Sequence, residues 1–538
     1  MFRRPSAHCA VVLIAIFGGA AEVVAGPKSF DLDLDLAGVA HALLPWVDEA
    51  RCLTEDSARE AAASGGGIRF AATHQVDRDL AEEGTWIDLG PEGRLCRWRI
   101  ESIGARSLNL GFTTFDLPAG ASLHVYAPDR AWVGGPFTAE DAREGEFWSP
   151  IFPGDALIVE LFVPAEPEPR VVLGSVQHDY RGFGRSARQG NCNNDVVCPE
   201  ADPWREEVRS VGLYTRNGAW RCTGQLVNSY DPARPPYFLT ADHCGISIAN
   251  DQTVVVYWNF ESPSCGDLCC GDLSEHTSGS VLLAHYAFSD FSLLRLSSGP
   301  DSAFDVVYSG WDARETAQPA RTISIHHPNT DEKAISFDLD PPTVTSHLSS
   351  FPPGNGSHWR IERWDDGTTE PGSSGGGLWD ENHRLIGQLH GGYASCDDDL
   401  SDWFGRLSRS WDGGGAASSR LRDWLDPDGT GGLVLDHHDP DESTSIPGAT
   451  ARLRVELGVR PHPAKGAVHL HFSLEREAVV SWEIFDVTGR RLLRANDERL
   501  AAGSYERLWS APPAPGVYLA RLILDGETGG SRSLLVVE

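Results

Sequence analysis

Apolar and polar residues alternate with a period of two along most of the chain, which is the period of a β-strand with one buried face. Runs rich in glycine and proline separate the alternating segments, as turns do. The clearest alternating runs are Leu108–Phe112, Leu123–Val125, Val254–Trp258, Ser292–Leu296, Val468–Phe472 and Val480–Ile484. The pattern therefore predicts an all-β protein.

The character of the alternation changes along the chain and divides it into domains. A chain of 538 residues is too long for one core and predicts roughly two to four domains. Residues 26–190 favour a β-sandwich-like domain, and residues 191–436, with many short strands, favour a barrel-type domain. Residues 437–450 are acidic, contain proline and are typical of a linker. Residues 451–538 predict a small separate β-sandwich.

Residues 1–25 have the three parts of a secretory signal peptide. Arg3 and Arg4 supply the charged start, Ala10–Ala21 is a short apolar stretch, and Val23–Ala25 offers small residues for cleavage. The apolar stretch is too short for a membrane anchor, and no later segment approaches the roughly twenty apolar residues that a spanning helix needs. We expect a secreted protein with no transmembrane segment.

Charge and cysteine content narrow the classes further. The formal net charge of −32 argues against a nucleic-acid partner, because phosphates would be repelled. Of the eleven cysteines, Cys9 lies in the expected signal, which leaves an even number in an exported chain. Disulfides are therefore expected. Cys52 and Cys96 are the expected pair of the N-terminal domain.

Three segments that lie far apart in the chain carry the residue types of nucleophilic catalysis by serine, in the order His243, Asp290, Ser374. A serine hydroxyl becomes a useful nucleophile when an imidazole takes its proton, and a buried carboxylate orients and stabilises that imidazole. Glycines around Ser374 allow a tight turn in which the amides of Gly372 and Ser374 point at one oxygen, forming an oxyanion hole.

Each of these segments alone has a structural explanation. A Gly/Ser run is usually a loop, and a histidine beside a cysteine is usually structural. Their combination is more specific, because the order His, Asp, Ser is that of chymotrypsin-like proteases, whereas subtilisin-like and α/β-hydrolase enzymes order these residues differently.

Residues 192 to about 436 resemble the bacterial lysyl endopeptidase family in four segments, which are 192–200, 369–375, 387–392 and 410–417. The resemblance implies a chymotrypsin-like double β-barrel protease domain with His243, Asp290 and Ser374 as its triad and no cofactor or metal. It also implies three disulfides, which are Cys192–Cys396, Cys198–Cys265 and Cys222–Cys244. Cys269 and Cys270 are left over, and no group of further ligands accompanies them that would favour a zinc site.

The regions on either side of residues 192–436 also resemble parts of known proteins. Residues 26–190 look like the family's propeptide, so the protease would have its own propeptide as a partner, and Arg185 and Arg188 mark an expected processing site. Residues 451–538 are similar to the Ig-like modules of flagellar hook-capping proteins and of bacterial secretion-sorting tails. That similarity is compatible with retention at the cell surface and equally with a plain stability domain.

A pocket for a basic side chain needs a carboxylate to offset the lost hydration of the cation. The position six residues before Ser374, where trypsins carry this carboxylate, holds Thr368. The resemblance implies Asp402 instead, and it places His390 and Gly391 beside the substrate. Counting back without gaps puts Phe351 where the family has the aromatic ring on which this histidine stacks.

The sequence leaves two alternatives, one for the preferred residue before the cut and one for the class of protein. The resemblance implies polypeptide cleavage after lysine, because one carboxylate suits a compact ammonium, whereas arginine prefers a two-pronged partner. The arginines at the expected processing site, however, leave cleavage after arginine open. A catalytically inactive secreted or surface-displayed binding protein is the alternative from another class, although such a protein has no need of all three triad residues.

Overall fold

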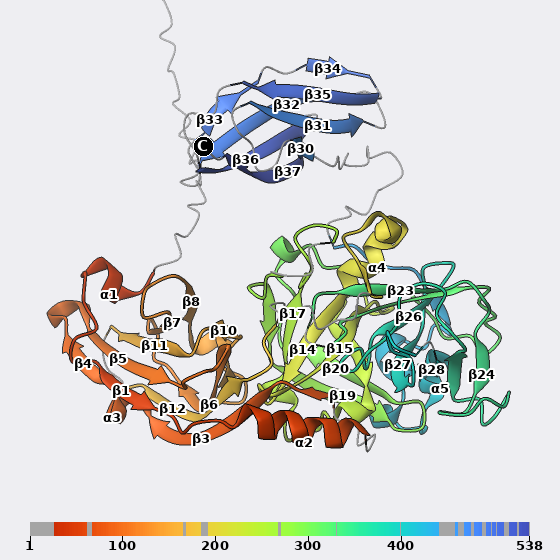
Figure 1. Ribbon diagram of the computed structural model, residues 1–538, viewed down its shortest axis with the longest axis horizontal. Helices are drawn as coiled ribbons and strands as arrows, with labels where there is room; N and C mark the ends of the chain where they lie inside the picture. Colours follow the sequence, from red (N-terminus) through yellow and green to blue (C-terminus); the bar gives the residue numbers. More distant parts are fainter. Residues whose placement is uncertain are drawn as a thin grey trace, which may run out of the picture. The chain divides into compact units, whose positions relative to one another are not determined.

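The computed structural model divides into two compact units, one ending at Asp439 and one beginning at Pro440 (Figure 1). It describes residues 26–61, 67–164, 168–183, 192–266, 271–329, 331–398 and 400–440, then 458–460, 467–474, 478–486, 491–495, 498–501, 503–510, 516–524 and 527–536. The expected signal peptide, Arg185, Arg188, Cys269 and Cys270 lie outside the described residues. No helix in this described part is both long and apolar enough to cross a membrane.

The N-terminal domain, residues 26–183, has two β-sheets around a common apolar core, as the alternation predicts. One sheet has the order β1-β5-β11-β7-β8 with β4 beside β5, and the other has β10-β6-β12-β3 with β9 beside β6. The strands are β1 (Ala40–Leu43), β3 (Ala71–Asp79), β4 (Thr85–Asp88), β5 (Arg94–Glu101), β6 (Ser107–Asp116), β7 (Ser122–Tyr126), β8 (Val133–Phe137), β9 (Phe147–Trp148), β10 (Phe152–Pro153), β11 (Ala156–Val163) and β12 (Arg170–Asp179).

Helices accompany these sheets, and strand periodicity did not predict them. They are α1 (Lys28–Asp31), α2 (Glu49–Ala61), α3 (Leu80–Glu83) and the 3-10 turns η1 (Gly90–Glu92) and η2 (Ala139–Asp141). In α2, Cys52 and Asp56 are buried, and their spacing of four residues places them on one face of the helix. This face packs toward Tyr180 at the end of the sandwich.

The expected Cys52–Cys96 disulfide is wrong, because both residues are buried free thiols. Cys52 packs beside Val47 and Tyr180, whereas Cys96 lies on β5 within the sandwich core, its Sγ 3.4 Å from the carbonyl of Leu80. Burial raises the pKa of Cys96 to about 12. Both cysteines act as small apolar side chains here, a role that an even cysteine count does not reveal.

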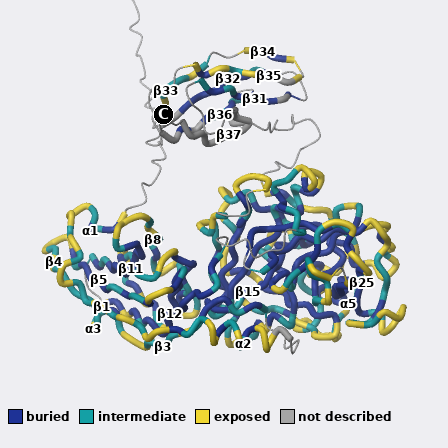
Figure 2. Tube along the Cα trace, viewed as in Figure 1, coloured by how far each residue is buried: buried dark blue, intermediate teal, exposed yellow. Residues whose placement is uncertain are grey.

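The central domain, residues 192–439, contains two further sheets. The first has the order β18-β17-β14-β15-β16-β20-β19, and the second has β13-β23-β22-β26-β27-β28-β25-β24 with β21 and β29 alongside. A shared apolar cluster joins them, with Leu239 and Leu293 from the first sheet and Ile325 and Leu385 from the second. Figure 2 shows these strands as the buried interior of the domain.

The first of these sheets consists of β14 (Val211–Arg216), β15 (Trp220–Val227), β16 (Tyr237–Ala241), β17 (Val255–Trp258), β18 (His276–Ser278), β19 (Ser280–Tyr286) and β20 (Phe291–Leu296). The second consists of β13 (Asn194–Asp195), β21 (Trp311–Asp312), β22 (Thr322–His326), β23 (Ala334–Asp338), β24 (Thr343–Thr345), β25 (His358–Ile361), β26 (Gly377–Asp380), β27 (Leu385–Gly392), β28 (Asp402–Arg406) and β29 (Val434–Leu435). Short helices lie between them, which are η3 (Pro199–Trp204), α4 (Arg205–Ser210), η4 (Asp242–Cys244), η5 (Asp251–Thr253), η6 (Ser302–Phe304), α5 (Leu407–Asp412), η7 (Ala417–Ser419) and α6 (Arg422–Leu425).

Three disulfides stabilise this domain, and they are the three pairs that the family resemblance implied. They join Cys192 to Cys396, Cys198 to Cys265 and Cys222 to Cys244. The first closes the longest loop, over 204 residues, and connects the start of the domain to the loop between β27 and β28. Closing so long a loop restricts the unfolded chain most strongly.

The second unit has its own core between two small sheets, as its alternating pattern predicts. The sheets are ordered β30-β31-β35 and β33-β32-β36-β37, with β34 beside β32. The strands are β30 (Gly458–Arg460), β31 (Val468–Leu474), β32 (Ala478–Asp486), β33 (Arg491–Arg494), β34 (Glu498–Leu500), β35 (Gly503–Trp509), β36 (Gly516–Leu524) and β37 (Glu527–Val536). The contacts of the first unit extend into the start of the expected linker, because His438 pairs with Tyr308 and Asp439 accepts a hydrogen bond from Arg209.

Candidate active site

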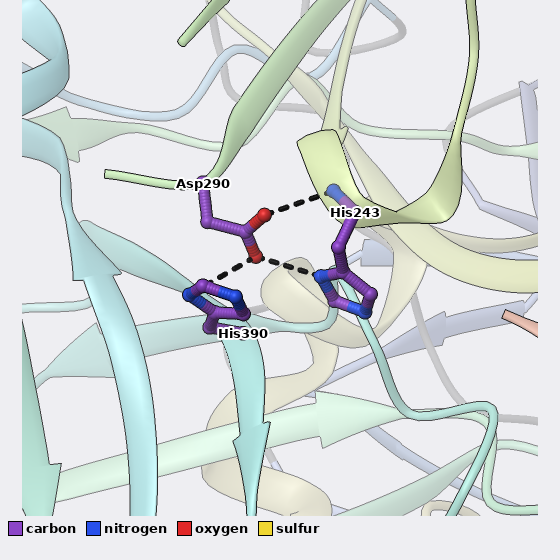
Figure 3. A group of neighbouring side chains, drawn as sticks. All are labelled: His243, Asp290 and His390. Carbon is purple, nitrogen blue, oxygen red and sulfur yellow. Dashed lines mark hydrogen bonds and ion pairs between the residues drawn. The ribbon is translucent and has the colours of Figure 1, made fainter. Parts of the chain in front are cut away.

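His243 and Asp290 are brought together by neighbouring strands of the first central sheet (Figure 3). His243 lies in η4, directly after β16, and Asp290 lies in the turn before β20, the strand that pairs with β16. One carboxylate oxygen accepts a hydrogen bond from His243 Nδ1 at 2.8 Å, and the other accepts one from the His243 amide at 2.9 Å. Asp290 therefore fixes both the ring and the backbone of this histidine.

Asp290 is itself held in place from behind. It is 1% exposed and adopts a φ of +55°, a left-handed conformation that aspartate tolerates better than most residues. Gln388 on β27 donates hydrogen bonds to the carbonyls of Ser289 and Asp290, at 2.8 and 3.1 Å. The second sheet thus supports the turn that presents the carboxylate.

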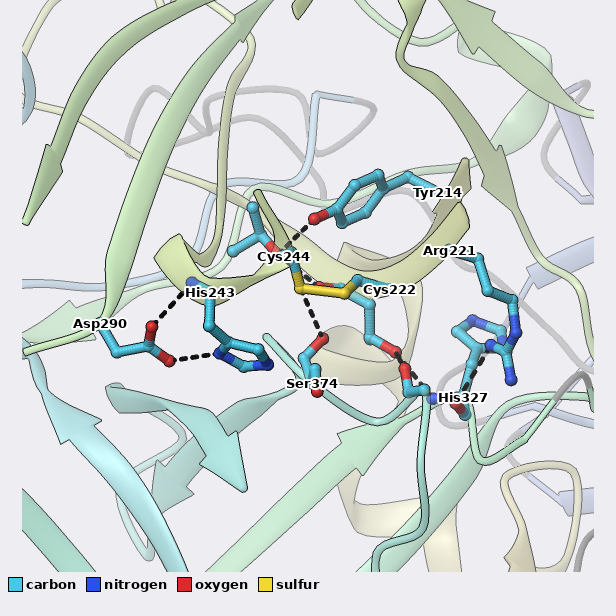
Figure 4. The surroundings of a disulfide bond; sticks show 11 residues. Tyr214, Arg221, Cys222, His243, Cys244, Asp290, His327 and Ser374 are labelled. Carbon is cyan, nitrogen blue, oxygen red and sulfur yellow. Dashed lines mark hydrogen bonds and ion pairs between the residues drawn. A yellow bond between two sulfur atoms is a disulfide. The ribbon is translucent and has the colours of Figure 1, made fainter. Parts of the chain in front are cut away.

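Ser374 lies in the loop before β26 and reaches the same place from the second sheet. Its carbonyl accepts a hydrogen bond from the Thr223 amide at 2.9 Å, and the Cys222–Cys244 disulfide connects β15 to the turn that carries His243. Figure 4 shows the His243 ring between the Asp290 carboxylate and Ser374. His243 and Ser374 line one cleft of about 360 Å³.

The loop around Ser374 depends on glycine. Gly372 has a φ of +96° and Gly375 has a φ of +83°, both in the region that favours glycine. A Cβ at Gly372 would also collide with the guanidinium of Arg221. Within the described residues, neither the Gly372 amide nor the Ser374 amide donates a hydrogen bond.

Four histidines form a column beside the cleft, and three of them come from the second sheet or its loops. The His390 ring stacks on His243, with centroids 5.2 Å apart, and on His347, with centroids 3.5 Å apart. His358 Nε2 lies 3.0 Å from His390 Nδ1. The expectation that Phe351 holds the ring position is wrong, because Phe351 is 78% exposed and His347 stacks on His390 instead.

Burial and mutual repulsion keep the column uncharged beyond His243. Burial, together with the charge of His243, lowers the pKa of His347 to about 4, and burial and His347 lower that of His358 to about 3. The pKa of His390 also falls, first through burial and then through its histidine neighbours. His243 differs, because the charge and hydrogen bond of Asp290 outweigh the effect of burial and raise its pKa above the ordinary value.

Ser373, next to Ser374, is fully buried in a neutral hydrogen-bond chain. Its Oγ lies 2.8 Å from His326 Nδ1, and His326 Nε2 lies 3.1 Å from Ser336 Oγ, which donates to the carbonyl of Thr368 at 2.6 Å. Burial lowers the pKa of His326 to about 3, so the chain carries no charge. It supports the Ser374 loop without an ion pair.

Asp402 begins β28 and lies wholly inside the second sheet, at 1% exposure. Its Oδ2 accepts hydrogen bonds from Trp364 Nε1 at 2.8 Å and Thr369 Oγ1 at 2.7 Å. The Ala394 amide also stabilises the charged carboxylate, and no described residue makes a hydrogen bond of ordinary geometry to Oδ1. Gly392 lines the cleft directly in front of Oδ1, since a Cβ built on it would lie 2.4 Å from that oxygen.

The cleft is thus lined by five of the predicted site residues, which are His243, Gly372, Ser374, His390 and Gly391. Asp290 lies behind His243, and Asp402 lies behind Gly392. Sequence reasoning missed His347, His358 and His326. The adjacent pair His326–His327 was visible in the chain, but no spacing rule links it to Ser373.

A cleft between two β-sheets holds Ser374 and His243, and the buried carboxylate of Asp290 lies behind the imidazole. This arrangement, with the chain order His, Asp, Ser, characterises the chymotrypsin-like serine endopeptidases. Comparison with known proteins agrees and is more specific. The profile of the lysyl endopeptidase N-terminal domain matches residues 44–177, and that of the lysyl endopeptidase C-terminal domain matches residues 186–405. The chain belongs to the lysyl endopeptidase family.

Individual relatives extend this comparison. A lysyl endopeptidase of Pseudomonas aeruginosa is 27% identical over 471 residues, covering 74% of this chain and 97% of the relative. Among solved structures, a Glu endopeptidase in complex with MPD is 14% identical, covering 40% of this chain and 92% of that one, with a TM-score of 0.26. Human heparin binding protein is 15% identical, covering 41% of this chain and 92% of that one, with a TM-score of 0.28.

Proposed function

We propose that this endopeptidase cuts peptide bonds after lysine, with Ser374 as nucleophile, His243 as general base and acid, and Asp290 as the group that orients His243. The observation that carries the proposal is the short His243–Asp290 hydrogen bond in a cleft that Ser374 shares. We further propose that the chain is secreted as a precursor and that its N-terminal domain is its propeptide.

The proposal assigns a residue to each step of the reaction. Asp290 accepts a hydrogen bond from Nδ1–H of His243, which leaves Nε2 free to take the proton of the Ser374 hydroxyl as Oγ attacks the carbonyl carbon. The amides of Gly372 and Ser374 stabilise the resulting oxyanion. His243 then gives the proton to the leaving amine, and water repeats the sequence to release the acyl product.

Lysine fits the buried carboxylate better than arginine does. Trp364 and Thr369 occupy Oδ2 of Asp402, so Oδ1, next to Gly392, is the oxygen left for a bound cation. A guanidinium is best matched by two parallel acceptors, whereas an ammonium is a compact charge that one oxygen can pair with. The single remaining oxygen therefore supports a preference for lysine.

The function is tested by mapping the peptide bonds that the processed protein cuts in a denatured protein substrate. We expect lysine before nearly every cut. Cuts after varied uncharged residues would remove the role assigned to Asp402. Absence of any cutting by the processed protein would favour an inactive binding protein built on this fold.

Activity is expected to fall as the pH is lowered toward 6, with two groups responsible. His243 must be neutral to accept a proton, and its pKa lies above the ordinary 6.5, so this loss begins above that pH. Asp402 must be ionised to pair with lysine, and burial raises its pKa to about 6. The logarithm of kcat/KM on a lysine peptide should therefore approach a slope of two in acid, measured from pH 8 to 5. For D402N a slope of one is predicted, and an unchanged slope would contradict the assignment.

Removing the ring of His347 is expected to slow the reaction modestly through His390. H347A should lower kcat by about 2- to 10-fold, the equivalent of one aromatic contact of about 0.5–1.5 kcal/mol. H347F restores a planar ring and should recover most of the loss. Equal loss in both variants, measured as kcat and KM separately, would exclude stacking as the reason.

A further inference from the structure

A short strand of the N-terminal domain is inserted next to the catalytic cleft. Strand β2 (Ile68–Arg69) pairs antiparallel with β15 of the central domain, with Ile68 opposite Arg221 and Arg69 opposite Trp220. The next residue continues the contact, since the amide of Phe70 donates to the carbonyl of Ala219 at 2.9 Å. β2 therefore adds a strand to the sheet that carries His243.

The cleft itself shows which side β2 covers. His390, Gly391 and Gly392 line the cleft in front of Asp402, and Trp220 lines it together with Ile68 and Arg69 of β2. The residue before the cut bond binds on the Asp402 side, according to the function proposed above. We infer that the chain beyond the cut runs past Trp220 along β15, which is the edge that β2 occupies.

Gly67 allows the backbone before β2 to approach this edge more closely than any other residue would. Its φ is +77°, and a Cβ built on it would lie 2.5 Å from the carbonyl oxygen of Arg221 and 2.8 Å from Sγ of Cys222. Cys222 forms the disulfide beside His243. Any side chain at residue 67 would therefore push the strand away from the wall of the cleft.

A buried ion-pair cluster holds β2 in this place from the other side. Asp56 on α2 is 3% exposed and accepts hydrogen bonds from Arg69 at 2.7 Å, Arg181 at 2.8 Å and Tyr180 at 2.7 Å. Removing one member of such a cluster leaves a buried charge uncompensated, which is costly. The cluster fixes Arg69 to the body of the N-terminal domain.

We propose that β2 is an inhibitory strand that blocks the leaving-group side of the cleft by taking the backbone partners on β15 that the substrate chain beyond the cut bond would use. This inference rests on the proposed function and adds the direction of the block. Main-chain pairing supplies the affinity, as in other cases of strand addition, and it requires no particular residue after the cut.

The test uses the full precursor, kept in one piece by substituting both arginines of the expected processing site (R185Q/R188Q). Its activity is measured on a lysine anilide, which has almost nothing beyond the cut bond, and on a peptide with four residues after lysine. Into this background G67A is introduced. G38A is the matched control, because Gly38 has a φ of +76° and nothing within 4 Å of a built Cβ.

We expect G67A to raise cleavage of the long peptide at least tenfold and to change anilide cleavage less than twofold, with G38A like the parent. R69Q, which weakens the cluster without adding an atom to the cleft, should act in the same direction as G67A. The inference is overturned if G67A and R69Q leave the long peptide unchanged, or if they raise cleavage of both substrates equally.

Labelling with a small organophosphorus fluoride separates this result from a failure of the proposed function. The label needs only an activated serine and little space on the leaving-group side. Label on Ser374 in every variant, with no effect of G67A or R69Q, would overturn the role of β2 alone. Absence of label from the variants and from the processed protein would overturn the proposed function.

Discussion

Replacing Ser374 with alanine is expected to lower kcat by about 10⁴- to 10⁶-fold, the loss that follows removal of a triad nucleophile. In the proposed mechanism the Ser374 Oγ is the atom that attacks, and no other serine, threonine or cysteine is among the described residues that line the cleft. KM should change little, since the Asp402 side of the cleft is untouched. Single-turnover hydrolysis of a lysine peptide by the processed protein measures the effect.

The neighbouring serine provides the matched control. Ser373 is fully buried and donates into the chain through His326, so S373A should cost roughly 1–3 kcal/mol of folding free energy for the polar group left unsatisfied. Its kcat should stay within about tenfold of the parent, because its hydroxyl does not face the cleft. A larger loss of kcat in S373A than in S374A would contradict the choice of nucleophile.

The second large effect is expected at Asp402. D402N keeps the shape of the side chain but removes its charge, so a bound ammonium would be buried without a partner, at a cost of about 3–5 kcal/mol. The kcat/KM for a lysine peptide should fall by about 10² to 10⁴-fold. Cleavage after an uncharged residue of similar length, such as norleucine, should be unaffected or improved.

The control for this change is another buried carboxylate of the same sheet. Asp338 on β23 is 3% exposed, and burial raises its pKa to about 7, but it does not line the cleft. D338N should therefore leave the ratio of lysine to norleucine cleavage unchanged. If D402N also left this ratio unchanged, the specificity assigned to Asp402 would be wrong.

The meeting of His243 with Asp290, and of His243 with Ser374 in one cleft, was predicted from the chain because the chemistry proposed for them needs particular residue types in a particular order. The period of two likewise predicted the strands, since it follows directly from a half-buried pleat. Rules of this kind predict the strand or turn to which a residue belongs. They do not specify which distant residues meet it.

The wrong predictions concern contacts between residues that are distant in the chain, and a helix with few buried residues. His347 stacks on His390 because the loop between β24 and β25 brings it there, and a gapless count placed the ring four residues later, at Phe351. Cys52 and Cys96 remain thiols because each belongs to a different core cluster. Helix α2 was missed because its inner face has only two buried residues among those described, Cys52 and Asp56, and one of them is polar. Such a face gives no apolar period of 3.6 residues in the sequence.

The role of β2 could not be inferred from the sequence either. Residues 67–69 contain a glycine, one apolar residue and an arginine, which is too short a stretch for any periodicity. Their meaning comes from register, because Ile68 lies opposite Arg221 beside the Cys222–Cys244 disulfide. Pairing across 153 positions of sequence is a property of the folded chain.

The most direct test of the account is to label the processed protein with a small organophosphorus fluoride at several pH values and to map the label by mass spectrometry. One phosphoryl group per chain on Ser374 is predicted, with a rate that falls as His243 is protonated and that collapses in H243A. Label spread over several serines, or a Ser374 that reacts equally well without His243, would contradict the assembly of the triad.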